Sequence, residues 1–321
     1  MSHLPLGAGP EFDRIRAIQR ELGGTGWELG DDCAILPPGR GQVVVSTDMS
    51  VEGVHFRRDW LSLEEIGWRA AAGALSDLAA EGASAIGLLS SVGAPAGTDT
   101  NALGELMHGV GAAAARAGAR VLGGDLSTAP QWVVDVVVLG RAARPVRRVG
   151  AQPGDGLWVT GALGGARAAL EAWRRGSEPG MDARSRFAHP EPRLAAGRWL
   201  ARHGARAMID LSDGLAGDAR HLAAASGVFV EIELERVPMA PDVAEIAVVV
   251  GESAEAFAAQ GGEDYELLVA LPPEFDPETV RRFRRSSGVT LSRVGWVTAG
   301  DGIRLTHGGV EVALHGFDHF R

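Results

Sequence analysis

The sequence predicts a mixed α/β fold divided into two domains. The spacing of apolar residues switches repeatedly between the alternation of strands and the period of helices. At 321 residues and 45% hydrophobic content, the chain is long enough for two ordinary domain cores. Residues 144–155 are rich in proline, glycine and charge, and they lie between two predicted strands. We therefore expect domains at residues 1–145 and 146–321.

The individual elements follow from local patterns, taken here in chain order. Alternating or short apolar runs predict strands at 42–47, 132–139, 157–160, 228–234, 265–271 and 293–297. Helical spacing predicts helices at 12–22, 63–81, 101–117, 165–175, 193–202, 215–225 and 277–285. Ser62 and Glu65 have the spacing of a capping box at the start of the second helix. We interpret residues 176–192 as a loop.

Composition excludes several classes of function. The net charge is −10, with 41 acidic and 31 basic residues, which argues against nucleic acid or an anionic membrane as a partner. Cys33 is the single cysteine, so neither an intrachain disulfide nor a cysteine zinc site can form. No apolar stretch has the length of a membrane span, and the first residues lack the pattern of a signal peptide. We expect a cytoplasmic protein.

Acidic residues recur beside glycine, serine or threonine, which let a backbone turn sharply or approach a ligand. These motifs are GDD at Gly30, STD at Ser46, GGD at Gly123, DLSDG at Asp210 and GGED at Gly261. Asp48 and Asp210 follow apolar runs, and Asp77 projects from a helical face of small residues. A single Gly-Asp is ordinarily a solvated turn, but six such sites favour a shared function.

Converging carboxylates need a cation, because like charges in a partly dry site repel strongly. The candidate ligands are oxygens and include no paired histidines, so Mg²⁺ is favoured. Since Mg²⁺ usually takes only one or two protein carboxylates, this many acids suggest several ions bound together with phosphates.

The absence of lysine from the whole sequence excludes a P-loop, a protein-kinase lysine and Schiff-base chemistry. Positive charge for phosphate must then come from Mg²⁺, backbone amides or arginine. Arg147 and Arg148 are candidates, although surface arginines are more often simply solvated. The strand-to-helix turn at 160–165 could offer amides to an anion, but a plain turn is favoured. His55 follows Asp48 and could reach the same site or serve only in packing.

Taken in order, the motifs resemble the thiamine-monophosphate kinase family over nearly the whole chain. They are GDDCA at Gly30, STD at Ser46, LSDLAAEGA at Leu75, GGD at Gly123, IDLSDGL at Ile209, GGEDYEL at Gly261 and GFDHF at Gly316. The resemblance implies the two-domain fold of aminoimidazole ribonucleotide synthetase, with an N-terminal ATP- and Mg-binding domain that also forms a homodimer. It further implies ATP-dependent phosphorylation of thiamine monophosphate to thiamine diphosphate, the last step in making this cofactor.

The resemblance also implies roles for individual residues. It implies Mg²⁺ ligands at Asp32, Ser46, Thr47, Asp48, Asp77, Asp125, Asp210 and Asp213, with Ser46 binding through side chain or backbone. Gly124, Asp125, Arg148 and Ser212 would contact ATP, while His55, Glu263 and Phe317 would bind thiamine monophosphate. Among these, Asp48, Asp125 and Asp213 would carry the catalysis.

One departure and three alternatives remain. Ala74 stands where many family members carry asparagine, which could change substrate or metal affinity. The chain could instead be another ATP-using superfamily member acting on a carboxamide, selenide or formylglycinamidine, but Cys33 is not placed as a selenide enzyme needs. It could also be a non-catalytic nucleotide-binding regulator or a metal-dependent phosphohydrolase.

Overall fold

The computed structural model describes residues 17–25 and 39–317 and divides the chain into two compact units. The first unit takes residues up to Leu78 together with Ser84–Ala143, and the second takes Ala79–Ala83 and the chain from Arg144 onward. Each unit contains a sheet and helices, in line with the mixed apolar patterns.

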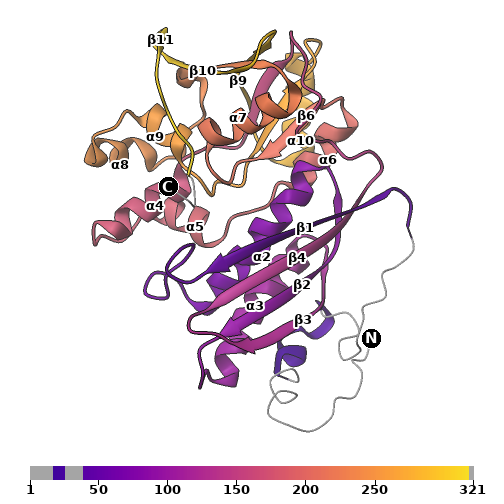
Figure 1. The fold of residues 1–321 in the computed structure, drawn as a ribbon, viewed down its shortest axis with the longest axis vertical. Helices are drawn as coiled ribbons and strands as arrows, with labels where there is room; N and C mark the ends of the chain where they lie inside the picture. The colour runs from indigo at the N-terminus through magenta and orange to yellow at the C-terminus, as the bar shows by residue number, and fades with distance from the viewer. Residues whose placement is uncertain (1–16, 26–38, 318–321) are drawn as a thin grey trace. The chain divides into compact units, whose positions relative to one another are not determined.

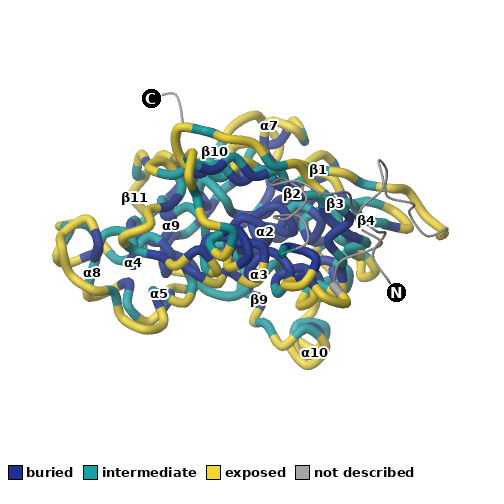
Figure 2. The backbone as a smooth tube through the Cα atoms, turned by 90° about the horizontal axis from the view of Figure 1, so that it is seen from below, coloured by how far each residue is buried: buried dark blue, intermediate teal, exposed yellow. Residues whose placement is uncertain are grey.

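The first unit is a four-stranded sheet with two helices on one face (Figure 1). Its elements are η1 (Gly23–Thr25), β1 (Gln42–Val51), α2 (Leu63–Ala80), β2 (Ser84–Ala94), α3 (Thr100–Arg116), β3 (Arg120–Thr128) and β4 (Val133–Ala142). The strand order is β1-β4-β2-β3, so β1 and β3 form opposite edges. Helix α2 is buried along most of its length (Figure 2).

Glycines let the two helices of the first unit approach closely. A Cβ on Gly67 of α2 would lie 1.9 Å from the carbonyl oxygen of Leu106 on α3. A Cβ on Gly109 of α3 would lie 1.9 Å from the carbonyl oxygen of Glu64 on α2. Because real Cβ atoms never come so near, both positions require glycine. This close crossing holds α2 against the sheet that carries the acidic motifs.

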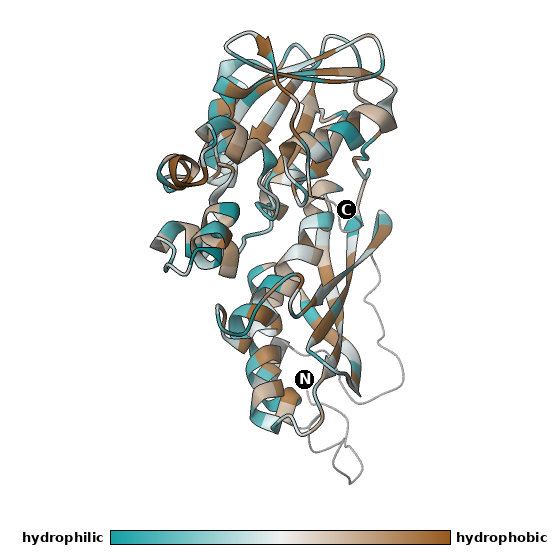
Figure 3. Cartoon of the chain, turned by 60° about the vertical axis from the view of Figure 1, so that its left-hand side comes forward, coloured by the Kyte–Doolittle hydropathy of each residue, from teal (hydrophilic) through white to brown (hydrophobic). Residues whose placement is uncertain are grey.

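The edge strand β1 has two distinct faces. Val43, Val45 and Met49 are 48%, 61% and 53% exposed, whereas the intervening residues Ser46 and Asp48 are more buried. Successive side chains of a strand point to opposite faces, so the exposed apolar residues share the face away from the helices. Figure 3 shows hydrophobic segments along the strands of this sheet. Among the described residues, the first unit therefore carries a sheet face on which β1 exposes apolar side chains, called here the open face.

The second unit is built on a seven-stranded sheet of order β11-β10-β7-β9-β5-β8-β6. Its strands are β5 (Gly156–Thr160), β6 (Ala207–Asp210), β7 (Phe229–Glu233), β8 (Leu267–Leu271), β9 (Leu291–Thr298), β10 (Gly302–His307) and β11 (Val310–Glu311). Its helices are α4 (Gly165–Arg174), α5 (Met181–Ala188), α6 (Leu194–Arg202), α7 (Leu215–Ser226), η2 (Leu234–Arg236), α8 (Val243–Val250), α9 (Ala254–Gln260) and α10 (Pro277–Ser287). Helix α7 contacts β6, β7, β8 and β10, and α10 packs on α6 and β9.

All six predicted strands are present, and the capping box is confirmed. Ser62 N–H donates to Glu65 Oε2 at 2.9 Å, and Glu65 N–H donates to Ser62 Oγ at 3.2 Å. The predicted helix at 12–22 falls partly outside the described residues, of which 17–22 are helical. The other predicted helices match observed ones to within about two residues.

The prediction of a loop at 176–192 is wrong, because α5 occupies Met181–Ala188. Its signal is one pair of apolar residues four apart, Ala183 and Phe187, which are both buried. Strands β2, β3, β6, β10 and β11 and helices α8 and α9 were likewise not predicted. Within residues 17–25 and 39–317, no helix is both long and apolar enough to cross a membrane.

Candidate active-site residues

Two carboxylates of the first unit lie close together between β1 and α2. Asp77 of α2 accepts a hydrogen bond from Ser46 Oγ at 2.5 Å, and its charge raises the pKa of Asp48 on β1. The strand brings Ser46 and Asp48 to this helix-facing side because they are two residues apart. Asp48 lies inside β1, which continues to Val51, and not at the end of the strand as the apolar run suggested.

The acidity of Asp48 reflects this crowding. Burial and, next, the charge of Asp77 raise the pKa of Asp48 from 3.8 to about 6. Arg69 of α2 acts in the opposite direction, and Asp135 of β4 raises the pKa slightly further. A cation beside Asp48 and Asp77 would relieve the repulsion, so the residues present fit a bound Mg²⁺.

Two other predicted ligands of the first unit lie on the open face. Thr47 Oγ1 donates to Asp135 Oδ1 at 2.9 Å, away from the side chains of Ser46 and Asp48. The register places Asp125 opposite Ser91, and Ser91 opposite Asp135. Residues directly opposite share a face, so these polar side chains form a row across the open face.

The first unit by itself does not bring Asp125 to Asp48. The two residues sit on opposite edge strands, three strand spacings or roughly 14 Å apart. The hydroxyl of Thr47, a predicted Mg²⁺ ligand, donates to Asp135 on the face opposite to Asp48 and does not join the Asp48–Asp77 pair.

The packing of β3 against β2 explains why residue 124 is glycine. A Cβ at this position would lie 1.9 Å from the carbonyl oxygen of Ser90, which does not accommodate it. Glycine therefore lets β3 run close to β2 just before Asp125. The contact of Gly124 with ATP stays a prediction in addition to this packing role.

In the second unit, the DLSDG loop carries two carboxylates whose charges act on a third, in the helix that follows. Asp210 ends β6 and is 5% exposed, and Asp213 follows in the turn before α7. Asp218, in the first turn of α7, accepts a hydrogen bond from Asp213 N–H at 3.1 Å. Burial, then Asp210 and Asp213, raise the pKa of Asp218 to about 8. The sequence analysis did not single out Asp218 as a site residue. Its position about one helical turn after Asp213 and Gly214 could have indicated that it lies near them.

Arg148 belongs to the same part of the second unit. Met208 N–H donates to the Arg147 carbonyl at 3.0 Å, so this segment runs beside β6. Ser226 Oγ donates to the Arg148 carbonyl at 3.0 Å. The guanidinium of Arg148 lowers the pKa of Asp218, which places this positive charge near the carboxylates, as a phosphate-binding arginine requires.

The GGED loop has an unusual backbone. Glu263 and Tyr265 are the non-glycine residues with positive φ among those described, at 66° and 50°. Glu263 N–H donates to the Ser212 carbonyl at 2.7 Å, and Tyr265 N–H donates to the Leu211 carbonyl at 3.0 Å. Left-handed backbone at such residues costs about 1–3 kcal/mol and persists only where the surroundings impose it. The loop that carries the predicted substrate ligand Glu263 is thus tied to the DLSDG loop.

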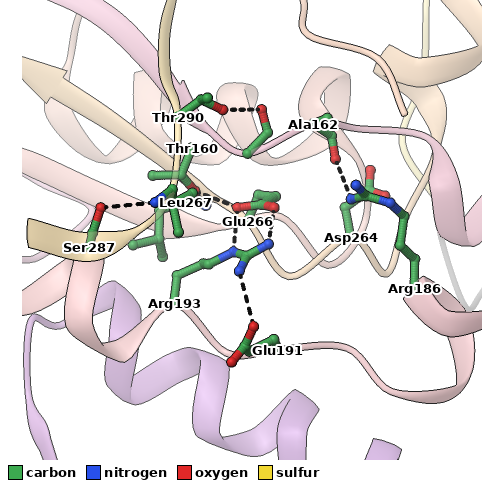
Figure 4. A network of polar contacts seen from close by, with 12 residues as sticks. Thr160, Ala162, Arg186, Glu191, Arg193, Asp264, Glu266, Leu267, Ser287 and Thr290 are labelled. Carbon is green, nitrogen blue, oxygen red and sulfur yellow. Dashed lines mark hydrogen bonds and ion pairs between the residues drawn. The ribbon is translucent and has the colours of Figure 1, made fainter. Parts of the chain in front are cut away.

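The two residues flanking Tyr265 anchor this loop inside the unit (Figure 4). Glu266 is fully buried and accepts from Arg193 Nε and Nη2 at 2.8 and 2.6 Å. Thr160 Oγ1 donates to Glu266 Oε2 at 2.7 Å. Asp264 accepts from Gly164 N–H at 2.8 Å, at the start of α4. Burial raises the pKa of Asp264 to about 8.

The turn at 160–165 therefore does not offer its helix-starting amide to an outside anion. The carboxyl group of Asp264 occupies that position, with backbone donors at Gly164 and Ala166. The plain-turn interpretation, which the sequence favoured, holds.

The remaining predicted substrate ligands are His55 and Phe317. Val51 N–H donates to His55 Nδ1 at 3.0 Å, so a neutral His55 ring carries its proton on Nε2. Phe317 is 55% exposed, and its N–H donates to the Asp213 carbonyl at 2.9 Å. Asp32 lies outside the described residues, and Ala74 is completely buried in α2.

Within the described residues, no three histidine, cysteine, aspartate or glutamate side chains come together as a metal-binding group. Asp48 and Asp77 form a pair only, which suits a metal that takes one or two protein carboxylates and completes its shell with phosphate and water.

Comparison with known proteins decides the family. Models of the N-terminal and C-terminal domains of AIR synthase related proteins match residues 30–142 and 152–308. The thiamine-monophosphate kinase of Mycobacterium tuberculosis (strain ATCC 25618 / H37Rv) is 40% identical over 271 residues, which cover 83% of this chain and 81% of that protein. The chain belongs to the thiamine-monophosphate kinase family.

Solved structures agree with this assignment. Thiamine-monophosphate kinase from Stenotrophomonas maltophilia K279a matches with a TM-score of 0.81 and 31% identity, covering 95% of this chain and 98% of that one. AaThiL complexed with AMPPCP and TMP matches with a TM-score of 0.79 and 30% identity, covering 97% of both chains. The family and the two-domain fold expected from the motifs are confirmed.

Proposed function

We propose that this chain transfers the γ-phosphoryl group of ATP to the phosphate of thiamine monophosphate, giving thiamine diphosphate and ADP. The observation that carries the proposal is the match to AaThiL, which binds AMPPCP and TMP and aligns with nearly the whole chain. The relatives from Mycobacterium tuberculosis and Halobacterium salinarum, 40% and 36% identical to this chain, are named thiamine-monophosphate kinases.

Each unit contributes groups suited to this chemistry. In the first unit, Asp48 and Asp77 would hold Mg²⁺, and Ser46 fixes Asp77 through its short hydrogen bond. Bound there, Mg²⁺ would neutralise phosphate charge and so allow two polyanions to meet. In the second unit, we propose Asp210 and Asp213 as further metal ligands and Arg148 as a phosphate ligand.

Residues proposed to bind the substrate are present in both units. The carboxylate of Glu263 and the exposed ring of Phe317 each favour a positively charged aromatic group such as the thiazolium of thiamine. The Nε2–H of His55 is a hydrogen-bond donor suited to a phosphate oxygen. Positioning and charge neutralisation then account for the reaction, without a covalent phosphoenzyme.

The test is product analysis with purified protein, Mg-ATP and thiamine monophosphate. Parallel reactions contain thiamine alone or no acceptor. Equal amounts of thiamine diphosphate and ADP, formed only with the monophosphate, support the proposal. ADP formed without an acceptor would indicate a phosphohydrolase, and tight Mg-ATP binding without turnover would indicate a regulator or a relative with another substrate.

We also propose that two copies of the chain pair through the open face. Val43, Val45 and Met49 expose apolar side chains on this face, and a monomeric surface rarely leaves such a row uncovered. Val45→Asp should shift the protein from dimer to monomer in sedimentation. Val310→Asp, at an exposed valine of β11 in the second unit, is the matched control and should leave the dimer intact.

A further inference from the structure

The last described segment of the chain, residues 312–317, is called here the C-terminal strap. Val312 N–H donates to the Leu305 carbonyl at 2.9 Å, which attaches the strap to β10. Leu314 is 8% exposed and anchors the strap in the second unit. Phe317 N–H then donates to the Asp213 carbonyl at 2.9 Å. The strap thus joins the predicted aromatic ligand of the substrate directly to the loop of a predicted metal ligand.

Two glycines meet where the strap crosses α7. A Cβ on Gly316 would lie 2.7 Å from Gly217 Cα and 2.9 Å from the Asp213 carbonyl oxygen. A Cβ on Gly217 would lie 3.1 Å from Gly316 Cα. Neither glycine has positive φ, so available space and not backbone conformation is what requires glycine here. Gly217 also lies in a helix, where glycine is about 1 kcal/mol less favourable than alanine, so its presence needs such a reason.

An arginine of α7 holds the strap at a second point. Arg220 Nη2 donates to the Leu314 carbonyl at 2.7 Å, and its Nε donates to the Ala216 carbonyl at 3.2 Å. The guanidinium is therefore oriented by its own helix and directed to the strap. A charged donor on a backbone carbonyl is among the stronger hydrogen bonds of this kind.

We propose that the Gly217–Gly316 crossing and Arg220 form a positioning device that fixes Phe317 and the Asp213 loop as one body. The inference rests on the proposed function and extends it, because it assigns roles to residues that touch neither substrate nor metal. Its consequence is that affinity for thiamine monophosphate and affinity for Mg²⁺ depend on the same contact.

The test uses Gly316→Ala and Arg220→Ala in the full chain, with His315→Ala as the matched control at the neighbouring exposed strap residue. Gly316→Ala should raise the KM for thiamine monophosphate about tenfold and the half-saturating Mg²⁺ concentration about threefold. Arg220→Ala should change both constants in the same direction, and Arg220→Lys, which keeps a donor, should recover part of the loss. His315→Ala should change neither constant.

A double-variant cycle separates positioning from general damage. In a Phe317→Ala background, Gly316→Ala should add little to the KM for thiamine monophosphate and should still raise the Mg²⁺ requirement. If the KM of the double variant rose by the product of the two single-variant increases, the inference would be overturned. The inference would also be overturned if Gly316→Ala and Arg220→Ala had the same KM for thiamine monophosphate and the same half-saturating Mg²⁺ concentration as wild type.

Hydrogen exchange provides a readout that does not need turnover. The amides of residues 312–317 should exchange faster in Gly316→Ala and Arg220→Ala than in wild type or His315→Ala. If wild type makes no thiamine diphosphate, the proposed function fails, and the strap is judged on hydrogen exchange and Mg-ATP affinity alone. Unchanged exchange and unchanged Mg-ATP affinity in both variants would then overturn the inference by itself.

Discussion

The backbone N–H of Phe317 donates a hydrogen bond to the carbonyl of Asp213 at 2.9 Å. One residue is a predicted ligand of the substrate and the other a predicted ligand of Mg²⁺, and 104 positions of sequence separate their numbers, 317 − 213. Because the bond uses only main-chain atoms, changes to the Phe317 side chain should leave it in place. This separates the role of the ring from the role of the strap.

Phe317→Ala should raise the KM for thiamine monophosphate about tenfold while the KM for ATP changes little, because only the aromatic contact with a cation is lost. Steady-state kinetics with each substrate varied in turn would measure this. Phe317→Trp, which keeps an aromatic face, is the matched variant and should stay near wild type. A parallel rise in both KM values would contradict a role in the substrate site.

Asp48→Asn should lower Mg-ATP turnover by at least about a hundredfold, because the variant loses a group that neutralises charge through the metal. The same variant should be more stable than wild type when no metal is present. In wild type, the folded pKa of Asp48, about 6, exceeds the ordinary 3.8. The stability of wild type therefore falls as pH rises from about 4 to about 6. At pH 8 Asp48 is ionised in the folded wild type, so the full loss of stability is present.

Urea unfolding at pH 8 with a chelator would measure this gain, expected at about 1–2 kcal/mol. Asp301→Asn, at an exposed aspartate, is the control and should change neither turnover nor stability. An active Asp48→Asn enzyme, or one less stable than wild type without metal, would remove Asp48 from the proposed metal site.

Asp264→Asn should flatten the dependence of stability on pH. Burial holds the folded pKa of Asp264 at about 8, above the ordinary 3.8, so wild type should lose stability as pH rises from about 4 to about 8. Asparagine keeps an acceptor for Gly164 N–H and carries no charge. The variant should therefore exceed wild type in unfolding free energy at pH 9.

Unfolding curves at several pH values between 5 and 9 would test this, with Asp264→Ala as the contrast. Alanine leaves the buried Gly164 N–H without its acceptor, at a cost of about 1–3 kcal/mol. If Asp264→Asn were less stable than wild type at every pH, the carboxyl group would be ionised in the folded protein and stabilised by the start of α4.

Arg193→Ala should destabilise the second unit by about 3–5 kcal/mol, because it leaves the buried carboxylate of Glu266 uncompensated. Chemical denaturation would measure the loss. Arg281→Ala, which removes an exposed pair with Glu278, is the control and should cost less than about 1 kcal/mol. The double variant Arg193→Met, Glu266→Leu should recover most of the loss, and no recovery would mean that the hydrogen bond from Thr160 matters more than the charge pair.

Local patterns predicted the elements with strong periodicity. The alternation of 228–234 and the capping box of Ser62 and Glu65 are encoded by neighbouring residues, so they were readable. Strands β2 and β3 were missed because Ser84–Ala94 is rich in glycine, alanine and serine and Arg120–Thr128 contains Gly123 and Gly124, and these residue types have weak strand preference. The pairing of β2 with β4 and of β3 with β2, which is long-range in sequence, makes them strands.

The motifs indicated which residues matter but not how they are arranged. STD places three predicted ligands in a row, yet a strand sends Thr47 to one face and its neighbours to the other. The GGED motif carries two neighbouring acids, of which Glu263 is the predicted substrate ligand, whereas Asp264 accepts a hydrogen bond from the start of α4. No sequence pattern distinguishes a carboxylate that binds a ligand from one that binds its own backbone, because the difference depends on a contact 100 residues away.

The two faces of β1 also limit how the gene can vary in length. Inserting or deleting one residue before Ser46 would reverse the direction of every later side chain in the strand. Asp48 would then point to the open face, and Met49 would point toward α2. A shift of register changes every later position of β1 at once, so length changes among relatives should be confined to the connections on either side of this strand.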